Sequence, residues 1–481
     1  MKINPPRPIT LTPYLVGGFL LLGTACDKQA VSVAHPATGD EAFALTADWP
    51  AFAQSPSSKV DILFMVDDSS SMAPLQAKLQ AGFADFMTAL ENLPGGVPDL
   101  HLGVVSSSMG AGRNASVDHC PSGGDQGILH NAKVGSTCAG VTLTDSYLSV
   151  RTDATSGQVV TNYGSASLAN AFGCISALGD QGCGFEHQLA SVLRALGADG
   201  AAAPEQNAGF MRPDAFLAVV LVTDEDDCSA PPTSDLFDEP SSYGPLQSYR
   251  CNEYGHLCMI DGKLQHPPRD MSTGELQGCR SAEDGRLVRV QDAVTALKAL
   301  KEDPTAVFFA AITGPATPYV VGLGPSENQS DSSMWPFIQH SCIHTENSGT
   351  ETYADPAVRL AQAVAGFGSH AFLGNLCDDT MGPALNAIST RFSRPMAAAC
   401  VATPDPAGPG CTVIDRGVDA AGRTATRLPS CADAGGATPC WRLVDDVPAC
   451  GAGAQRLEVD RGGVVAPAST VTAIDCTTAH P

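Results

Sequence analysis

Five short apolar runs between residues 60 and 393 predict the strands of a sheet. They lie at 60–66, 100–105, 216–222 and 307–312, with a weaker run at 371–376. Most of these runs lack the alternation of polar and apolar residues that marks a sheet with one face in water. Continuous runs rich in Val, Ile and Phe are typical of strands buried on both faces, as in parallel sheets.

Segments with helical spacing lie between these runs. After the first run, apolar residues recur in steps of three and four from Leu75 to Leu90, and the sequence NLPGG at 92–96 ends this pattern. Further helical periods occupy 185–196, 288–300, 356–367 and 382–392. Strands that alternate with helices predict the α/β class, with a doubly wound and mostly parallel sheet.

The pattern changes in three interior stretches and again near residue 395. Polar, cysteine-rich stretches at about 110–165, 225–285 and 314–350 predict insertions that disulfides keep in order. Residues 397–481 are rich in Gly, Ala, Pro and Thr and contain six cysteines, which predicts a small, disulfide-rich β-type module. We therefore divide this part of the chain into an α/β domain, 58–396, and a C-terminal module, 397–481.

The first 57 residues predict an export signal followed by a flexible tether. Lys2 and Arg7 precede a short apolar core, and the sequence GTAC at 23–26 places small residues before a cysteine. Residues 1–25 followed by Cys26 resemble a bacterial lipoprotein signal, which implies that Cys26 carries the lipid. The alternative is a plain signal peptide that is cut at the same bond. Residues 26–57 are rich in Ala, Asp, Pro and Ser, which is typical of a tether.

The net charge and the number of cysteines limit which partners and which cellular location are expected. The 481 residues include 51 acidic and 27 basic side chains, which give a formal net charge of −24. A nucleic-acid-binding protein needs a basic surface to neutralise phosphates, so we expect no nucleic-acid partner. Setting Cys26 apart from the 17 cysteines leaves an even number, which suits an exported, oxidised protein. We expect a cell-envelope location, with the N-terminal lipid as the attachment to the membrane.

Cysteine positions also give expectations about pairing. The pairs expected in the α/β domain are Cys120 with Cys138, Cys174 with Cys183, and Cys342 with Cys377. Three connectivities are open for the four cysteines of the second insertion, Cys228, Cys251, Cys258 and Cys279, and fifteen for the six C-terminal cysteines. The segment 251–258 also contains a histidine and is compatible with a zinc site, but an oxidising compartment favours disulfides.

The stretch FMVDDSSSMAPLQ at 64–76 carries the candidate binding chemistry. It follows the first apolar run and precedes a helix, and Asp67, Ser69 and Ser71 have the spacing D-x-S-x-S. Ligands of doubly wound sheets bind at the carboxyl ends of strands. Carboxylate and hydroxyl oxygens are ligands that Mg²⁺ takes. The alternative without a ligand is that Ser71 caps the helix while the acidic side chains are solvated in a turn.

A second acidic run follows the third predicted strand, where VVLVTDEDDC at 219–228 leads directly into Asp224. Together, the two runs resemble the von Willebrand factor A family, whose metal-ion-dependent adhesion site combines D-x-S-x-S with a later Thr and Asp. The resemblance covers roughly 60–393 and implies Mg²⁺ or Mn²⁺, rather than Ca²⁺, as the cation. The resemblance also implies that the metal ligands are Asp67, Ser69, Ser71 and Asp224. We expect Asp226 and Asp227 to support the site or to lie at the surface.

The place of the family's threonine holds the sequence QGCGFEHQL at 181–189. Cys183 stands there, and a disulfide-bonded cysteine is a poor ligand for a hard cation. Glu186 is a nearby residue that could supply an oxygen instead. The whole arrangement also resembles von Willebrand factor A-type lipoproteins with a disulfide-rich tail from myxobacteria and related lineages.

The sequence favours binding over catalysis. It contains no G-x-S-x-G elbow, no H-E-x-x-H motif and no phosphate-binding glycine loop, so we expect no enzyme activity. In the family that the chain resembles, an acidic side chain of a protein partner completes the coordination of the metal. The resemblance therefore implies metal-dependent protein binding or adhesion. The alternative is an envelope scaffold with a degenerate metal site and metal-independent interactions.

Overall fold

The computed structural model describes a defined set of residues. These are 51–53, 59–91, 97–114, 116–131, 138, 140–153, 156, 158–238, 243–269, 274–301, 304–325, 333–346, 349–393, 400–402, 410–419, 422–445, 453–462 and 471–476. The expected signal peptide, Cys26 and most of the expected tether lie outside them.

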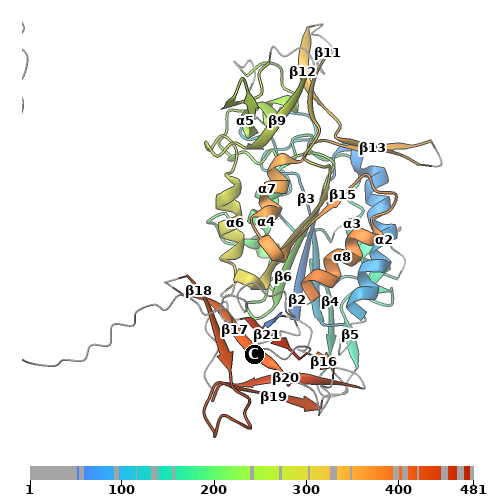
Figure 1. The fold of residues 1–481 in the computed structure, drawn as a ribbon. Coiled ribbons are helices and arrows are strands. Elements are labelled where there is room, and N and C mark those ends of the chain that lie inside the picture. The colour runs from blue at the N-terminus through green and yellow to red at the C-terminus, as the bar shows by residue number, and fades with distance from the viewer. Residues whose placement is uncertain are drawn as a thin grey trace, which may run out of the picture. The chain divides into compact units, whose positions relative to one another are not determined.

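A seven-stranded sheet forms the centre of the α/β domain (Figure 1). Its strand order is β15 (Ala371–Asn375), β10 (Val307–Thr313), β6 (Phe216–Val222), β2 (Lys59–Val66), β3 (Asp99–Ser106), β4 (Leu148–Thr152) and β5 (Val159–Thr161). The first five strands are parallel, whereas β4 and β5 are antiparallel to their neighbours. The predicted α/β class with a mostly parallel sheet is confirmed, and so are all five expected strands.

Helices cover both faces of this sheet (Figure 1). One core includes side chains of α2 (Ala73–Glu91), α3 (Leu168–Ser176) and α8 (Gly382–Ser393). The opposite core includes side chains of α4 (Gln188–Leu196), α6 (Val290–Lys298) and α7 (Val358–Ala365). Successive strand residues point to opposite faces, so Phe64 packs in the first core and Met65 in the second. This two-sided burial explains why β6 and β10 are wholly apolar or nearly so.

The polar stretches contain more regular structure than the sequence showed. The first supplies β4 and β5, which extend the central sheet. The second and third supply a separate sheet of β12 (Met334–Gln339), β11 (Tyr319–Pro325), β9 (Gly274–Ser281), β7 (His256–Ile260) and β8 (Lys263–Gln265). They also hold α5 (Tyr249–Gly255) and the first strand of a hairpin made by β13 (Cys342–Thr345) and β14 (Glu351–Ala354). Because β9 and β11 come from different insertions, neither stretch reveals the pairing by itself.

The disulfides correct two expected pairs. Cys120 is bonded to Cys183 and Cys138 to Cys174, so the predicted pairs of Cys120 with Cys138 and of Cys174 with Cys183 are wrong. Cys174 lies on α3 and belongs to the core against which Cys138 packs, whereas Cys183 follows in the loop before α4. The Cα atoms of Cys120 and Cys183 are 4.5 Å apart, which is within disulfide range. Proximity in the fold therefore overrides proximity in sequence.

The described part of the chain contains five further disulfides. The pairs are Cys342 with Cys377, as expected, and Cys228 with Cys251, Cys258 with Cys279, Cys411 with Cys476, and Cys431 with Cys440. Both cysteines of the segment 251–258 are thus used in disulfides and not as zinc ligands. This number of disulfides indicates an exported protein in an oxidising environment. Among the helices of the described residues, none is long and apolar enough to cross a membrane.

The C-terminal residues form two small sheets. One contains β16 (Cys400–Ala402), β20 (Ala454–Asp460) and β19 (Cys440–Asp445). The other contains β1 (Ala51–Ala53), β21 (Val471–Asp475), β17 (Thr412–Asp419) and β18 (Gly422–Leu428). The strand β1 corrects the expectation that the tether runs to residue 57, because it pairs with β21 near the other end of the chain. Three residues carry too little pattern to predict such a strand.

Candidate functional site

The D-x-S-x-S motif lies at the carboxyl end of β2, where the chain turns into the short helix η1 (Ser70–Met72) and then α2. The backbone N–H of Asp67 donates a hydrogen bond to the backbone oxygen of Val222, at the end of β6, with an N···O distance of 3.0 Å. Asp224 follows two residues after Val222. The structure therefore brings the two acidic runs together at the carboxyl ends of adjacent parallel strands, where such sheets bind their ligands.

Asp67 is fully buried, and its carboxylate accepts hydrogen bonds from three neighbouring residues. Its Oδ1 accepts from the backbone N–H of Ser69 at 2.8 Å and from the hydroxyl of Ser107 at 3.3 Å. Its Oδ2 accepts from the hydroxyl of Thr223 at 2.5 Å. Burial raises the pKa of Asp67 even so, while these donors act to lower it. Ser107 and Thr223 are not among the site residues expected from the sequence, although each directly follows an apolar strand.

Asp224 is the unusual residue of the site. The residue is 2% exposed, and among the described residues neither of its carboxylate oxygens accepts a hydrogen bond of standard geometry, although the Ser71 hydroxyl is close enough to lower its pKa. Burial, and then the charge of Asp67, raise the pKa of Asp224 to about 8, although the Ser71 hydroxyl acts to lower it. No lysine or arginine of the described residues forms an ion pair with Asp67 or Asp224. The site therefore holds buried carboxyl groups without a basic partner, and their raised pKa values express the cost of ionising them there.

Two glutamates extend this acidic region. Glu186, in the loop before α4, is buried, and its Oε1 has no hydrogen-bond partner among the described residues. Burial raises its pKa well above the usual range, and the charges of Glu225 and Asp67 add to the effect. Glu225 also has a strongly raised pKa, first because of burial. Glu186 therefore lies within electrostatic reach of Asp67.

The remaining polar groups of the motif face one another. The hydroxyl oxygens of Ser69 and Ser71 are 3.2 Å apart, and Ser69 does not cap η1 with its side chain. Asp68 accepts a hydrogen bond through its backbone oxygen from the N–H of Gly182 at 2.7 Å. Burial, then the charges of Asp67 and Asp125, raise the pKa of the Asp68 carboxyl to about 7. The two serine hydroxyls therefore lie next to each other, and the Ser69 hydroxyl is not used to cap η1.

The second half of the 224–227 run is structural. Asp226 accepts from the backbone N–H groups of Arg359 and Leu360 at the start of α7, at 2.8 and 3.1 Å. The ring of His256 contacts the same carboxylate at 2.7 Å. Asp227 pairs with the buried guanidinium of Arg359 at 2.8 Å. These two aspartates are compensated, so Asp224 is the aspartate of this run that lacks a basic partner among the described residues.

The donor set fits a small divalent cation. Two carboxylates and two serine hydroxyls are oxygen ligands of the kind that Mg²⁺ takes when it keeps several waters. The described residues contain no group of three or more His, Cys, Asp and Glu side chains with metal-binding geometry. Glu186 therefore does not form a three-carboxylate cluster with Asp67 and Asp224. Cys183 is fully buried in its disulfide with Cys120 and offers no thiolate.

Gly182 holds the loop against the motif, and replacing it with alanine is expected to disturb the site. A Cβ there would overlap Oδ1 of Asp68 and lie 2.7 Å from its backbone oxygen. We expect Gly182→Ala to lower Mg²⁺ affinity about 10- to 100-fold, as losses of supporting contacts around metal sites do. Isothermal titration calorimetry measures this change. The matched control is Gly184→Ala in the same loop, where a Cβ would meet nothing within 4 Å. Equal affinity in both variants would contradict the prediction.

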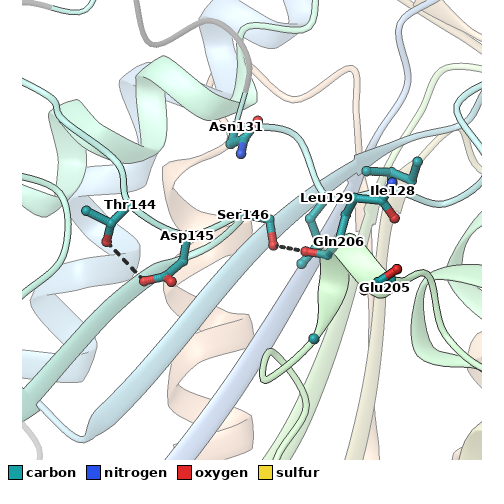
Figure 2. Close-up of a pocket in the computed structure, with 9 residues that line it drawn as sticks. Ile128, Leu129, Asn131, Thr144, Asp145, Ser146, Glu205 and Gln206 are labelled. Carbon is teal, nitrogen blue, oxygen red and sulfur yellow. Dashed lines mark hydrogen bonds between the residues drawn. The ribbon is translucent and has the colours of Figure 1, made fainter.

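A separate surface depression of about 340 Å³ contains none of the motif residues (Figure 2). Asp145, Ser146 and Glu205 are among the residues that line it. The Thr144 hydroxyl donates to Asp145 at 3.2 Å and that of Ser146 to the backbone oxygen of Gln206 at 2.5 Å. Its hydroxyls are thus already bonded to neighbours, so we do not place the function there.

Comparisons with known proteins do not assign a family. No family model matches the chain, and no curated protein matches it. Similar solved structures include the pilus adhesin SpaC from Lactobacillus rhamnosus GG, with 13% identity, a TM-score of 0.31, and coverage of 88% of this chain and 39% of that chain. The conserved hypothetical protein BatB from Bacteroides thetaiotaomicron has 10% identity, a TM-score of 0.26, and coverage of 70% and 98%.

The pilus adhesin RrgA from Streptococcus pneumoniae has 9% identity, a TM-score of 0.21, and coverage of 88% of this chain and 57% of that chain. The chain therefore spans less than two thirds of the length of either adhesin. At these TM-scores the likenesses carry no argument about fold or function.

Proposed function

We propose that this protein is a lipid-anchored cell-envelope protein with a von Willebrand factor A-type domain that binds a protein partner through a divalent metal ion. The observation that carries the proposal is Asp224, a buried carboxylate whose two oxygens have no partner among the described residues. It lies beside Asp67, which is also buried. Two neighbouring buried carboxylates are costly unless an opposite charge compensates them. A divalent cation would supply that charge.

The residues that would hold the cation are the carboxylates of Asp67 and Asp224 and the hydroxyls of Ser69 and Ser71. Mg²⁺ or Mn²⁺ suits this small set better than Ca²⁺, which takes six to eight oxygen ligands. Glu186 is a further oxygen donor within electrostatic reach. When bound, the metal would offer a coordination position to an acidic side chain of the partner. The role proposed is binding without catalysis, at a membrane to which the lipid on Cys26 attaches the chain.

One observation favours a second candidate function, an envelope scaffold with a degenerate metal site. Cys183 stands where the family has a threonine ligand, and its disulfide with Cys120 removes that ligand. In the scaffold, the fold and its disulfides carry interactions that need no metal. The two candidates differ in whether chelation of divalent cations abolishes partner binding.

The metal site is tested by Asp67→Ala. Because Asp67 links the motif to Thr223 and faces Asp224, we expect its loss to abolish Mg²⁺ and Mn²⁺ binding. Isothermal titration calorimetry on the full chain, purified in detergent, measures this. Glu205→Ala, in the depression of Figure 2, is the control and should bind as the parent does. Absence of binding by the parent, or equal binding by Asp67→Ala, would overturn the metal site.

Partner binding is tested by capture from an envelope extract. The full chain should retain a specific protein in Mg²⁺ and lose it in EDTA, and Asp67→Ala should fail to retain it in either buffer. A partner retained equally in EDTA and by Asp67→Ala would support the scaffold.

A further inference from the structure

The β13–β14 hairpin is fixed next to the candidate metal site at two points. Strand β14 leads directly into Asp355, whose backbone N–H donates to the backbone oxygen of Asp224 at 2.7 Å. At the other strand, the disulfide of Cys342 with Cys377 ties the start of β13 to the loop after β15. The hairpin extends past the end of α2 that follows the D-x-S-x-S motif (Figure 1). It is therefore a neighbour of the site with a defined position.

One face of the hairpin is exposed and carries apolar and aromatic side chains. Ile343 pairs across the strands with Tyr353, and their side chains are 60% and 37% exposed. The ring of His340 stacks on Tyr353, with centroids 3.8 Å apart and an interplanar angle of 17°. We call His340, Ile343 and Tyr353 the hairpin platform. Apolar side chains left exposed beside a binding site often mark the surface that a partner covers.

The surroundings of the platform are acidic. Oδ1 of Asp355 lies 2.7 Å from Nδ1 of His340, and Glu351 is exposed on the same hairpin. Burial raises the pKa of Tyr353, and the charges of Asp224, Glu225 and Asp355 raise it further, so the phenol lies within reach of these groups. The nearest described lysine on α2, Lys78, is buried and donates to the backbone oxygen of Leu376 at 3.4 Å. This acidic setting would attract a cationic side chain.

We propose that the hairpin platform selects the partner by receiving an arginine or lysine side chain that lies next to the acidic side chain on the metal. The inference rests on the proposed function, which supplies the acidic side chain. Because the ring of His340 already covers one face of Tyr353 and contacts Oδ1 of Asp355, the cationic head would pair with Oδ2 of Asp355 and lie against the other face of the Tyr353 ring. The aliphatic stem would pack on Ile343, as the stems of Lys and Arg do on apolar surfaces. The partner is therefore a protein segment with adjacent acidic and basic residues.

A peptide array tests this selection. The probes are Gly-Ser-spaced peptides with one fixed Asp, whose neighbour on either side is Arg, Lys, Leu, Tyr or Glu. The labelled full chain is applied in Mg²⁺ and in EDTA. We expect peptides with Arg or Lys to retain about three- to tenfold more protein than those with Leu, as a cation–π contact allows, and to lose it in EDTA. A preference for Leu, Tyr or Glu, no preference, or retention in EDTA would overturn the inference.

Two variants assign the selection to the platform. Tyr353→Leu removes the aromatic ring, and Asp355→Asn removes the charge but keeps the backbone N–H that bonds to Asp224. Both should lose the preference for Arg and Lys, and Tyr353→Leu should bind Mg²⁺ by calorimetry as the parent does. Thr345→Ala, also exposed on the hairpin, is the control and should keep the preference. A preference that survives in both variants overturns the platform's role, whereas a parent without Mg²⁺ binding overturns the proposed function itself.

Discussion

Replacing Arg359 with methionine is expected to lower the free energy of unfolding by about 3–5 kcal/mol, the cost of breaking a buried ion pair. The Arg359 side chain is fully buried, and its guanidinium donates to Asp227 at 2.8 Å. It also donates to the Ser281 hydroxyl at 2.8 Å and to the backbone oxygen of Val288 at 2.6 Å. Methionine fills part of the volume but leaves the Asp227 carboxylate in the core without its counter-charge. The loss is therefore electrostatic and not a matter of packing alone.

Urea unfolding followed by circular dichroism measures the effect of Arg359→Met. The matched control is Arg113→Met, because Arg113 pairs with Asp238 at the surface, with 59% of its side chain exposed. Exposed pairs of this kind contribute about 1 kcal/mol or less. A loss for Arg359→Met as small as that of the control would show that Asp227 finds another partner or water.

The main strands of the central sheet could be predicted because they are buried on both faces, and their consecutive residues are therefore apolar. β6 and β10 are buried at every position, and the runs at 216–222 and 307–312 are correspondingly apolar. β4 and β5 could not be recognised in the same way. β5 has three residues and an exposed pattern, and it is ordered by pairing with β4 at the edge of the sheet. Its structure is imposed by a neighbour and not by its own sequence.

The site was partly predictable for a related reason. Asp67 and Asp224 each follow a strand directly, and parallel strands bring their carboxyl ends to one edge. The different roles of Asp224 and Asp227 could not be read from the run TDEDDC. They depend on Arg359, which is more than a hundred residues away and whose guanidinium pairs with Asp227 and not with Asp224. Likewise, Cys120 forms a disulfide with Cys183 because the fold brings their loops together. Such long-range partners leave no local pattern.

Replacing Asp224 with asparagine is expected to stabilise the metal-free protein at pH 8. The usual carboxyl pKa of 3.8 applies to the unfolded chain, whereas burial raises the pKa of Asp224 to about 8 in the folded one. Between these values the unfolded chain has released a proton that the folded chain still holds. The free energy of unfolding therefore falls as pH rises from about 4 to 8. Above pH 8 the carboxyl is ionised in both states, and the loss of stability from burying its charge no longer grows. Each pKa unit corresponds to about 1.4 kcal/mol, so removing the charge should recover several kcal/mol.

Urea unfolding in EDTA at pH 4 and pH 8 tests this expectation, with Asp224→Asn gaining at pH 8 and changing little at pH 4. Saturating Mg²⁺ should stabilise the parent, because a ligand that binds only the folded state shifts the equilibrium toward it, and should not stabilise the variant. Asp226→Asn is the matched control, and it should lower the free energy of unfolding where Asp224→Asn raises it. Asp226 is already compensated by His256 and by the first N–H groups of α7. If Asp224→Asn were destabilised in EDTA at pH 8 as Asp226→Asn is, the Asp224 carboxylate would have to be compensated without a metal.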